Sequence, residues 1–270
     1  MTFAFVEADR EYRAKLEATG DLASAFAAAC AVGTVDLCGT DLTRAVLARM
    51  KSYYTAQEQI KEVLEKRYAA AAADFFVETV AFYLKVAIQI RKLTLSVTSE
   101  QVVNKHVRQF FKAQAKAKAL IDALGLDQVK TILDTFGLDW PDAIAWAKGD
   151  GRLVSPVPKE IRADISAWSG DSLVAVIECK TQFGRARTTW LEDFEKREAQ
   201  LRIQQPRANL FLLVMTEANW DGFDRHDCRF GKQFFALLDK DHWPTAVEPS
   251  GSKIAGLVHP VESLFRLVLG

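Results

Sequence analysis

Three charged residues, Asp164, Glu178 and Lys180, have the types and the spacing that metal-assisted hydrolysis needs. Glu178 and Lys180 end the apolar run SLVAVIECK, and Asp164 lies in the run RADISAW, fourteen residues before Glu178. The sequence SGDS between the runs predicts a tight turn, and hence an antiparallel hairpin. In that hairpin Asp164 lies opposite Ile177 or Glu178, depending on the register. If it opposes Glu178, Lys180 lies on the same face, because side chains alternate along a strand.

Such a trio predicts a definite chemistry. Two carboxylates whose Cβ atoms are about 5 Å apart repel each other unless a proton or a cation lies between them. Mg²⁺ takes hard oxygen ligands and keeps several waters, so two carboxylates and a phosphate oxygen are sufficient to hold it. The metal would activate a water, and a neighbouring ammonium would stabilise charge on the phosphate. The pattern indicates phosphodiester hydrolysis; the alternative is a Glu and a Lys that end a strand in solvent.

These residues resemble the PD-(D/E)xK nuclease superfamily, which includes most type II restriction endonucleases. Glu178-Cys179-Lys180 is the only D/E-x-K triplet in the sequence, and Ala163 stands where the family name expects proline. The resemblance implies a mixed β-sheet in αβββαβ order. It also implies that Asp164, Glu178 and the backbone carbonyl of Cys179 are metal ligands, and that Lys180 is catalytic.

Many members of this superfamily also carry a glutamate on the helix before the sheet, and Glu78 is the candidate here. Its neighbours at helical spacing are Phe75, Ala81 and Phe82, so it is expected on an apolar face. A buried carboxylate needs a partner, which a metal would supply. The alternatives are an ion pair with Lys85 or a position at the edge of that face.

Nucleic-acid contacts are expected from two segments. A stripe of basic residues falls on one face of a helix and suits phosphate contacts, or else faces solvent. Its members are Lys105, Arg108, Lys112 and Lys116. Gln182, Arg185 and Arg187 follow the triplet and would lie near a phosphate at the metal. His226 and Cys228 lie in a later loop and lack a second Cys/His pair at ligand spacing, so we expect an ordinary loop there.

The elements around the trio predict an α/β (α+β) fold, with a restriction-endonuclease-like mixed β-sheet core flanked by helices and a largely helical N-terminal region. Helices are expected at 5–18, 22–31, 41–68, 71–91, 99–124 and 127–136, and strands at 162–168, 172–180 and 209–216. Thr98 or Ser99 is the expected N-cap of the fifth helix and Gly125 its C-cap. Thr189 and Glu192 have the spacing of a capping box for a further helix.

The expected domain organisation is an N-terminal helical region, 1–70, and a nuclease core, 71–270. The core comprises the helix 71–91, a helical insertion at about 98–148, the sheet and catalytic motif at 150–216, and a C-terminal part, 217–270.

Composition sets limits on the partners. The chain of 270 residues has 35 Lys and Arg and 35 Asp and Glu, so no global positive field favours a polyanion. The four cysteines form no CxxC pair, which is typical of reduced thiols. The N-terminus lacks the pattern of a signal peptide, and acidic or basic residues interrupt the longest apolar run. We expect a cytoplasmic protein without a membrane partner.

The sequence therefore predicts a Mg²⁺-dependent deoxyribonuclease, most like a type II restriction endonuclease that cuts double-stranded DNA site-specifically. Mn²⁺ is expected to substitute for Mg²⁺. A homodimer is expected by analogy, with the helices 41–68 and 71–91 as candidates for its surface. The alternatives are an exonuclease or a repair or junction nuclease of the same superfamily, and a non-catalytic DNA-binding subunit with this fold.

Overall fold

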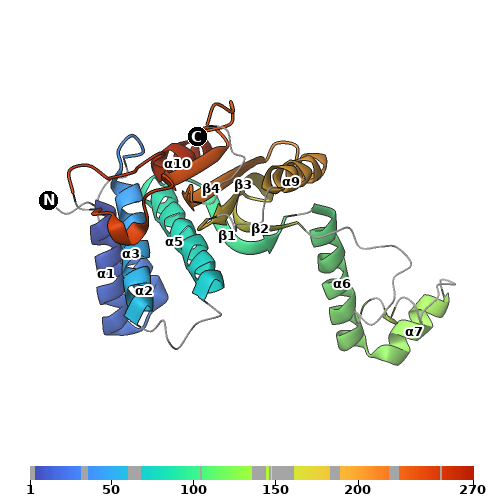
Figure 1. Cartoon of the computed structure of the whole chain (residues 1–270). Helices are drawn as coiled ribbons and strands as arrows, with labels where there is room; N and C mark the ends of the chain where they lie inside the picture. Colours follow the sequence, from blue (N-terminus) through green and yellow to red (C-terminus); the bar gives the residue numbers. More distant parts are fainter. Residues whose placement is uncertain are drawn as a thin grey trace.

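Five strands in the middle of the chain form one mixed sheet, which is visible at the centre of the computed structural model (Figure 1). The structure describes residues 4–31, 36–59, 68–103, 105–135, 144–145, 147, 161–182, 189–218, 225–249 and 251–270. The strands are β1 (Leu95–Val102), β2 (Arg162–Ser169), β3 (Ser172–Lys180), β4 (Asn209–Thr216) and β5 (Phe234–Leu238). They lie in the order β1-β2-β3-β4-β5. The pairs β1-β2 and β2-β3 are antiparallel, and β3-β4 and β4-β5 are parallel.

Helices precede, interrupt and follow the sheet. The described α-helices are α1 (Ala4–Thr19), α2 (Leu22–Cys30), α3 (Asp41–Gln59), α5 (Tyr68–Ile90), α6 (Lys105–Leu124), α7 (Leu126–Thr135), α9 (Trp190–Gln204) and α10 (Val261–Leu269). A short 3₁₀-helix, η1, spans Pro244–Ala246. The predicted α/β class and the helical N-terminal region are confirmed. In the described ranges, no helix has the length and apolar character needed to cross a bilayer.

The two faces of the sheet bury different sets of side chains. Ala175, Ile177 and Cys179 of β3 lie in the larger core, which also contains side chains of α3, α5 and α10. Val176 lies on the opposite face, in a second core with Trp190 of α9. Because successive side chains of a strand point to opposite faces, Glu178 and Lys180 project toward the α9 side.

The N-terminal helices share the larger core with the sheet. Met50 of α3 and Phe76 of α5 are fully buried in it, and Tyr53 stacks on Phe75 with ring centroids 4.4 Å apart. The apolar faces of α3 and α5 are therefore largely occupied by packing within the chain. The dimer surface expected on these two helices would have to use their remaining, more polar residues.

Two of the described strands, β1 and β5, were not predicted, and they lie at the two edges of the sheet. Residues 95–102 form β1 at the edge of the sheet, paired with β2, and α6 begins only at Lys105. Thr98 lies opposite Ser166 and Ser99 opposite Ile165, so the prediction that one of them caps a helix starting at residue 99 is wrong. The alternation in LSVTSEQV suits a half-buried strand, because one face of such a strand remains polar.

Of two other predicted helix-end signals, the C-cap at Gly125 is confirmed and the capping box at Thr189 is not. Gly125 adopts a positive φ of 80° directly after α6, as expected of a helix C-cap. Helix α9 begins after Thr189, but the Thr189 side chain forms no capping hydrogen bond, so the capping box is not formed. Helices α6 and α7 project away from the sheet (Figure 1).

Candidate active site

The hairpin between β2 and β3 has the register that unites the trio. Near the turn Trp168 pairs with Leu173, but beyond it Ala167 pairs with Ala175, so Val174 is one extra residue in β3. This β-bulge moves all later pairs by one position, and Ile165 pairs with Ile177. One step further, the same register aligns Asp164 with Glu178. Without the bulge, Asp164 would align with Ile177.

The two strands separate where the acidic residues lie. Their pairing ends at Ile165 and Ile177, although β2 continues to pair with β1 and β3 with β4. The Asp164 carboxylate fills the gap, because its Oδ2 accepts a hydrogen bond of 2.8 Å from the backbone N–H of Cys179. At the end of the β2-β3 ladder, a polar side chain thus takes the place of backbone pairing.

Lys180 lies between the two carboxylates. Its Nζ is 3.3 Å from Asp164 Oδ2 and 4.0 Å from Glu178 Oε2. The side chains of Asp164 and Lys180 are 23% and 33% exposed, whereas that of Glu178 is 6% exposed. The arrangement presents a buried acid at the base of the site, with a second acid and an ammonium at its rim.

Glu178 is the most perturbed group of the site. Burial, together with the nearby Asp164 carboxylate, raises the pKa of Glu178 to about 7, although Arg197 and Lys180 oppose this shift. Its Oε2 forms an ion pair with Nη1 of Arg197, and its Oε1 is buried without a hydrogen-bond partner among the described residues. A buried carboxylate with an unpartnered oxygen is stabilised by a proton or by a cation.

The residues present fit a divalent metal of the Mg²⁺ type. Two carboxylate oxygens lie around one ammonium, and an orphaned oxygen of Glu178 has no partner in the described protein. No cluster of three or more His, Cys, Asp and Glu side chains suited to a metal occurs in the described ranges. A metal here would therefore take the remaining ligands from backbone, water or substrate, as Mg²⁺ often does. The Cys179 backbone carbonyl stays a predicted ligand.

Arg197 was missed by the sequence analysis. It lies on α9, seventeen residues after Lys180, and no motif marks it. The available signal was its helical spacing from Trp190, Phe194 and Leu201, which are all buried against the sheet. Arg197 follows Phe194 by three residues, so it lies close to the sheet-facing side of α9.

Glu78 is not on an apolar face. Its side chain is 68% exposed and lies 3.5 Å from Arg49 of α3, so the expectation of a buried position is wrong. Glu78 occupies the edge position, which was one of the expected alternatives. Its ion-pair partner is Arg49, whereas the other alternative named Lys85. No described contact joins Glu78 to Asp164, Glu178 or Lys180, and its role as a metal ligand stays a prediction.

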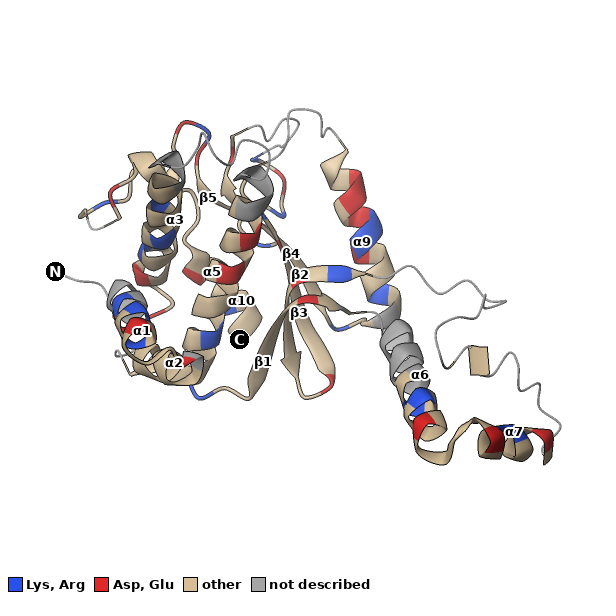
Figure 2. Ribbon diagram, turned by 90° about the horizontal axis from the view of Figure 1, so that it is seen from below, with Lys and Arg blue, Asp and Glu red and all other residues tan. Residues whose placement is uncertain are grey.

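The predicted nucleic-acid contacts are only partly within the described chain. Gln182 and Lys116 are exposed. Arg185 and Arg187 lie outside the described residues, as do the side-chain surroundings of Lys105, Arg108 and Lys112 in α6. Figure 2 shows acidic and basic residues interspersed along the described helices, in keeping with the equal numbers of both charges.

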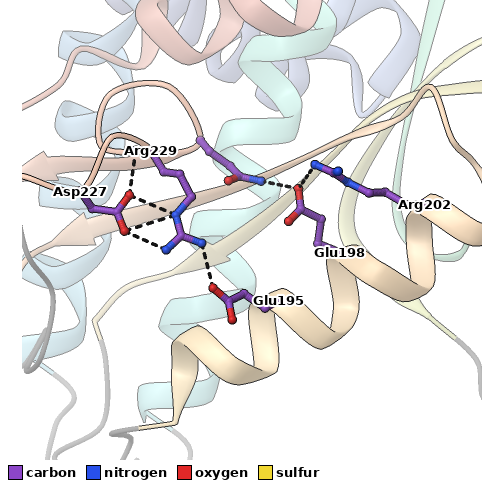
Figure 3. A network of polar contacts seen from close by, with 6 residues as sticks. Glu195, Glu198, Arg202, Asp227 and Arg229 are labelled. Atoms are coloured by element: carbon purple, nitrogen blue, oxygen red, sulfur yellow. Dashed lines mark hydrogen bonds and ion pairs between the residues drawn. The ribbon is translucent and has the colours of Figure 1, made fainter.

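A polar network holds α9 against the segment before β5 (Figure 3). Arg229 bonds to Asp227 at 2.8 Å and to Glu195 of α9 at 3.0 Å, and its guanidinium lies over the Phe234 ring. The hydrogen bonds from Arg229 lower the pKa of Asp227 to about 2. Glu198 accepts hydrogen bonds from Arg202 and Gln233. These contacts give Asp227 and Arg229 a structural role, and the expectation of an ordinary loop at His226 and Cys228 stays a prediction.

Comparisons with known proteins identified no relative of the chain. No protein-family model, no curated protein and no solved structure matches the chain. Functional inference therefore depends on the site itself.

Proposed function

We propose that the protein is a Mg²⁺-dependent nuclease that hydrolyses phosphodiester bonds of DNA. The observation that carries this proposal is the meeting of Asp164, Glu178 and Lys180 where β2 and β3 separate. A bulge at Val174 supplies the required register, and the side chains of Asp164 and Lys180 are partly exposed to solvent. A strand that merely ended in solvent would not bury Glu178.

Each residue has a role that follows from its surroundings. Asp164 and Glu178 would hold the metal, whose contribution is to acidify a water and to offset charge on the phosphate. Lys180 lies near both carboxylates, so its ammonium can orient the attacking water or stabilise the pentacovalent phosphate. The hydrogen bond from Cys179 N–H fixes the Asp164 carboxylate before substrate binds.

The order of the elements supports a nuclease of the PD-(D/E)xK type. Helix α5, strands β1, β2 and β3, helix α9 and strand β4 follow one another along the chain, with α6 and α7 inserted between β1 and β2. This is the αβββαβ order that the sequence resemblance implies. Within that superfamily, we propose a type II restriction endonuclease that acts as a homodimer on double-stranded DNA, by analogy with members of similar architecture.

A plasmid-cleavage assay tests the proposal. Supercoiled DNA is incubated with the wild type, with Lys180→Ala and with Lys253→Ala, in Mg²⁺ and in EDTA; Lys253 is an exposed lysine of the C-terminal part. We expect discrete fragments with the wild type and with Lys253→Ala in Mg²⁺ only, and a loss of at least about 100-fold in rate with Lys180→Ala.

Other outcomes would revise the proposal. A smear, or loss of DNA only from free ends, would replace site-specific cleavage by exonuclease activity. Mg²⁺-dependent cleavage that survives Lys180→Ala would contradict the assigned site. No cleavage of any DNA, with tight DNA binding retained, would indicate a non-catalytic DNA-binding subunit.

A further inference from the structure

Arg197 already occupies the side of Glu178 that a metal would need. Its Nη1 pairs with Glu178 Oε2, and its side chain is 38% exposed while that of Glu178 is 6% exposed. The guanidinium thus reaches from the surface of α9 to the buried carboxylate at the base of the site.

The two oxygens of Glu178 have different surroundings. Oε1 is enclosed, with essentially no solvent contact and no partner in the described chain. Oε2 is the oxygen near Lys180 Nζ, at 4.0 Å, and it is the one that Arg197 binds. A cation shared between Asp164 and Glu178 would bind Oε2, because Lys180 places this oxygen on the Asp164 side of the carboxylate.

The helix that carries Arg197 is fixed on two sides. Trp190, Phe194 and Leu201 bury their side chains against the sheet. Glu195 and Glu198 bond to the segment around Arg229 and Gln233 (Figure 3). The position of Arg197 therefore follows from the packing of α9 and does not depend on the ion pair alone.

We propose that Arg197 is the resident counter-ion of Glu178, and that a divalent cation must displace its guanidinium from Oε2 to enter the site. This inference rests on the proposed metal-dependent function and concerns the same site. Arg197 acts as a positioning residue: its ion pair orients the carboxylate until the cation binds, and it competes with that cation.

Two consequences follow from the exchange. A cation at Glu178 Oε2 would lie close to the Arg197 guanidinium, and the two positive charges would repel each other. Removal of Arg197 therefore strengthens cation binding. The same change leaves Glu178 buried without a counter-ion, so it destabilises the chain when a chelator is present.

The experiment measures Ca²⁺ binding to the full chain by calorimetry at pH 8.5, with Ca²⁺ as a hard oxygen-binding probe. Wild type is compared with Arg197→Gln, Arg197→Lys and the control Lys196→Gln, which removes an adjacent, 69% exposed charge from the same helix. Asp164→Asn locates the binding site. We expect Arg197→Gln to bind Ca²⁺ roughly fivefold more tightly than the wild type, and Arg197→Lys to change in the same direction by less. Lys196→Gln should bind as the wild type does, and Asp164→Asn should lose binding.

Thermal unfolding of the same proteins supplies a second readout. In EDTA, Arg197→Gln should unfold at a lower temperature than the wild type and Lys196→Gln, and saturating Ca²⁺ should raise its Tm by more than it raises that of the wild type. If Arg197→Gln does not fold, which circular dichroism detects, Arg197→Lys carries the comparison.

The outcomes separate this inference from the proposed function. If the wild type binds Ca²⁺ in an Asp164-dependent manner and cleaves DNA, but no folded Arg197 variant binds Ca²⁺ more tightly, only the counter-ion role is wrong. An equal gain with Lys196→Gln would also overturn it, because the effect would then be one of general charge. If the wild type shows no Asp164-dependent Ca²⁺ binding and no cleavage, both proposals are wrong.

Discussion

Asp164 bonds to the backbone of the strand beside it: its Oδ2 accepts the N–H of Cys179 at 2.8 Å, at the point where the β2-β3 ladder has ended. The carboxylate thus satisfies a buried backbone donor and presents charge to Lys180 at the same time. These two roles can be separated by substitution, because only one of them needs a negative charge.

Asp164→Asn and Asp164→Ala should therefore differ in stability but not in activity. The Asn side chain retains an oxygen that can accept the Cys179 N–H, so Asp164→Asn should unfold within about 1 kcal/mol of the wild type, whereas Asp164→Ala should lose about 1 to 3 kcal/mol. Both should lose DNA cleavage by about 100-fold or more, because neither supplies the metal-binding charge. Urea unfolding in EDTA and the plasmid assay measure the two effects. Equal stability of both variants would argue against the backbone role of Asp164.

The raised pKa of Glu178 predicts a pH dependence of stability. Its ordinary pKa is 4.5 and burial raises it to about 7 in the folded chain. Between these values the folded state binds more protons than the unfolded state, so the contribution of this group to stability is full below about pH 4.5 and is lost as the pH rises through about 7. The amide side chain in Glu178→Gln is neutral at every pH. This variant should therefore lack the pH-dependent contribution of Glu178 to the free energy of unfolding.

The measurement is urea unfolding in EDTA at pH 5.5 and pH 8.0. The wild type should lose more of its free energy of unfolding than Glu178→Gln between the two pH values. The same loss in both proteins would show that Glu178 ionises without cost in the folded chain. Mg²⁺ should reduce the difference, since it stabilises the charged carboxylate that the raised pH produces.

The hairpin and the trio could be predicted because they depend on local patterns. Alternating apolar residues, a turn signal and an acid-x-lysine triplet are all contiguous in the sequence, and β2, β3 and β4 lie where these patterns predict strands. The register could be predicted only to within one residue. The bulge that decides it places Trp168 and Leu173 in the core on the α9 side, and Ala167 and Ala175 in the other core. Such packing on two faces is a tertiary property.

The features that the sequence analysis did not predict also depend on tertiary packing. Thr98 and Ser99 have good capping side chains, yet pairing with β2 places them in a strand, because tertiary contacts override local preference. Glu78 has apolar neighbours at helical spacing but lies at the exposed edge of that face, which a pattern without its packing partner does not reveal. Arg197 is recognised only once α9 is docked on the sheet.

The network around Arg229 should stabilise the docking of α9. Arg229→Met removes two ion pairs and the cation-π contact with Phe234, and should cost about 1 to 2 kcal/mol of the free energy of unfolding. Arg202→Met removes a pair in which the arginine is 69% exposed, and should cost less than about 0.5 kcal/mol. Amide hydrogen exchange of α9 should accelerate in Arg229→Met and remain unchanged in Arg202→Met. Unchanged exchange in both variants would indicate that burial of Trp190, Phe194 and Leu201 alone fixes the helix.

The buried carboxylate of Glu262 in α10 connects this C-terminal helix to the first turn of α3. Glu262 Oε1 accepts the N–H groups of Leu42, at 2.6 Å, and Thr43, so that a residue 220 positions away caps the first turn of α3. Thr43 Oγ1 in turn accepts the N–H of Val261. Burial raises the pKa of Glu262, and the hydrogen bonds from α3 and the Thr43 hydroxyl oppose this shift.

Glu262→Ala should therefore be strongly destabilising. It leaves two buried donors at a helix N-terminus without an acceptor, which should cost about 2 to 4 kcal/mol, whereas Glu262→Gln retains an oxygen acceptor and should cost less than half of that. Chemical unfolding with both variants measures the difference. DNA cleavage by Glu262→Gln at a temperature where it is folded should equal that of the wild type, because α3 and α10 lie in the core on the opposite face of the sheet from Glu178. A loss of cleavage without a loss of stability would show that α3 contributes to the active site, and Arg49, which pairs with Glu78, would be the first residue of α3 to test.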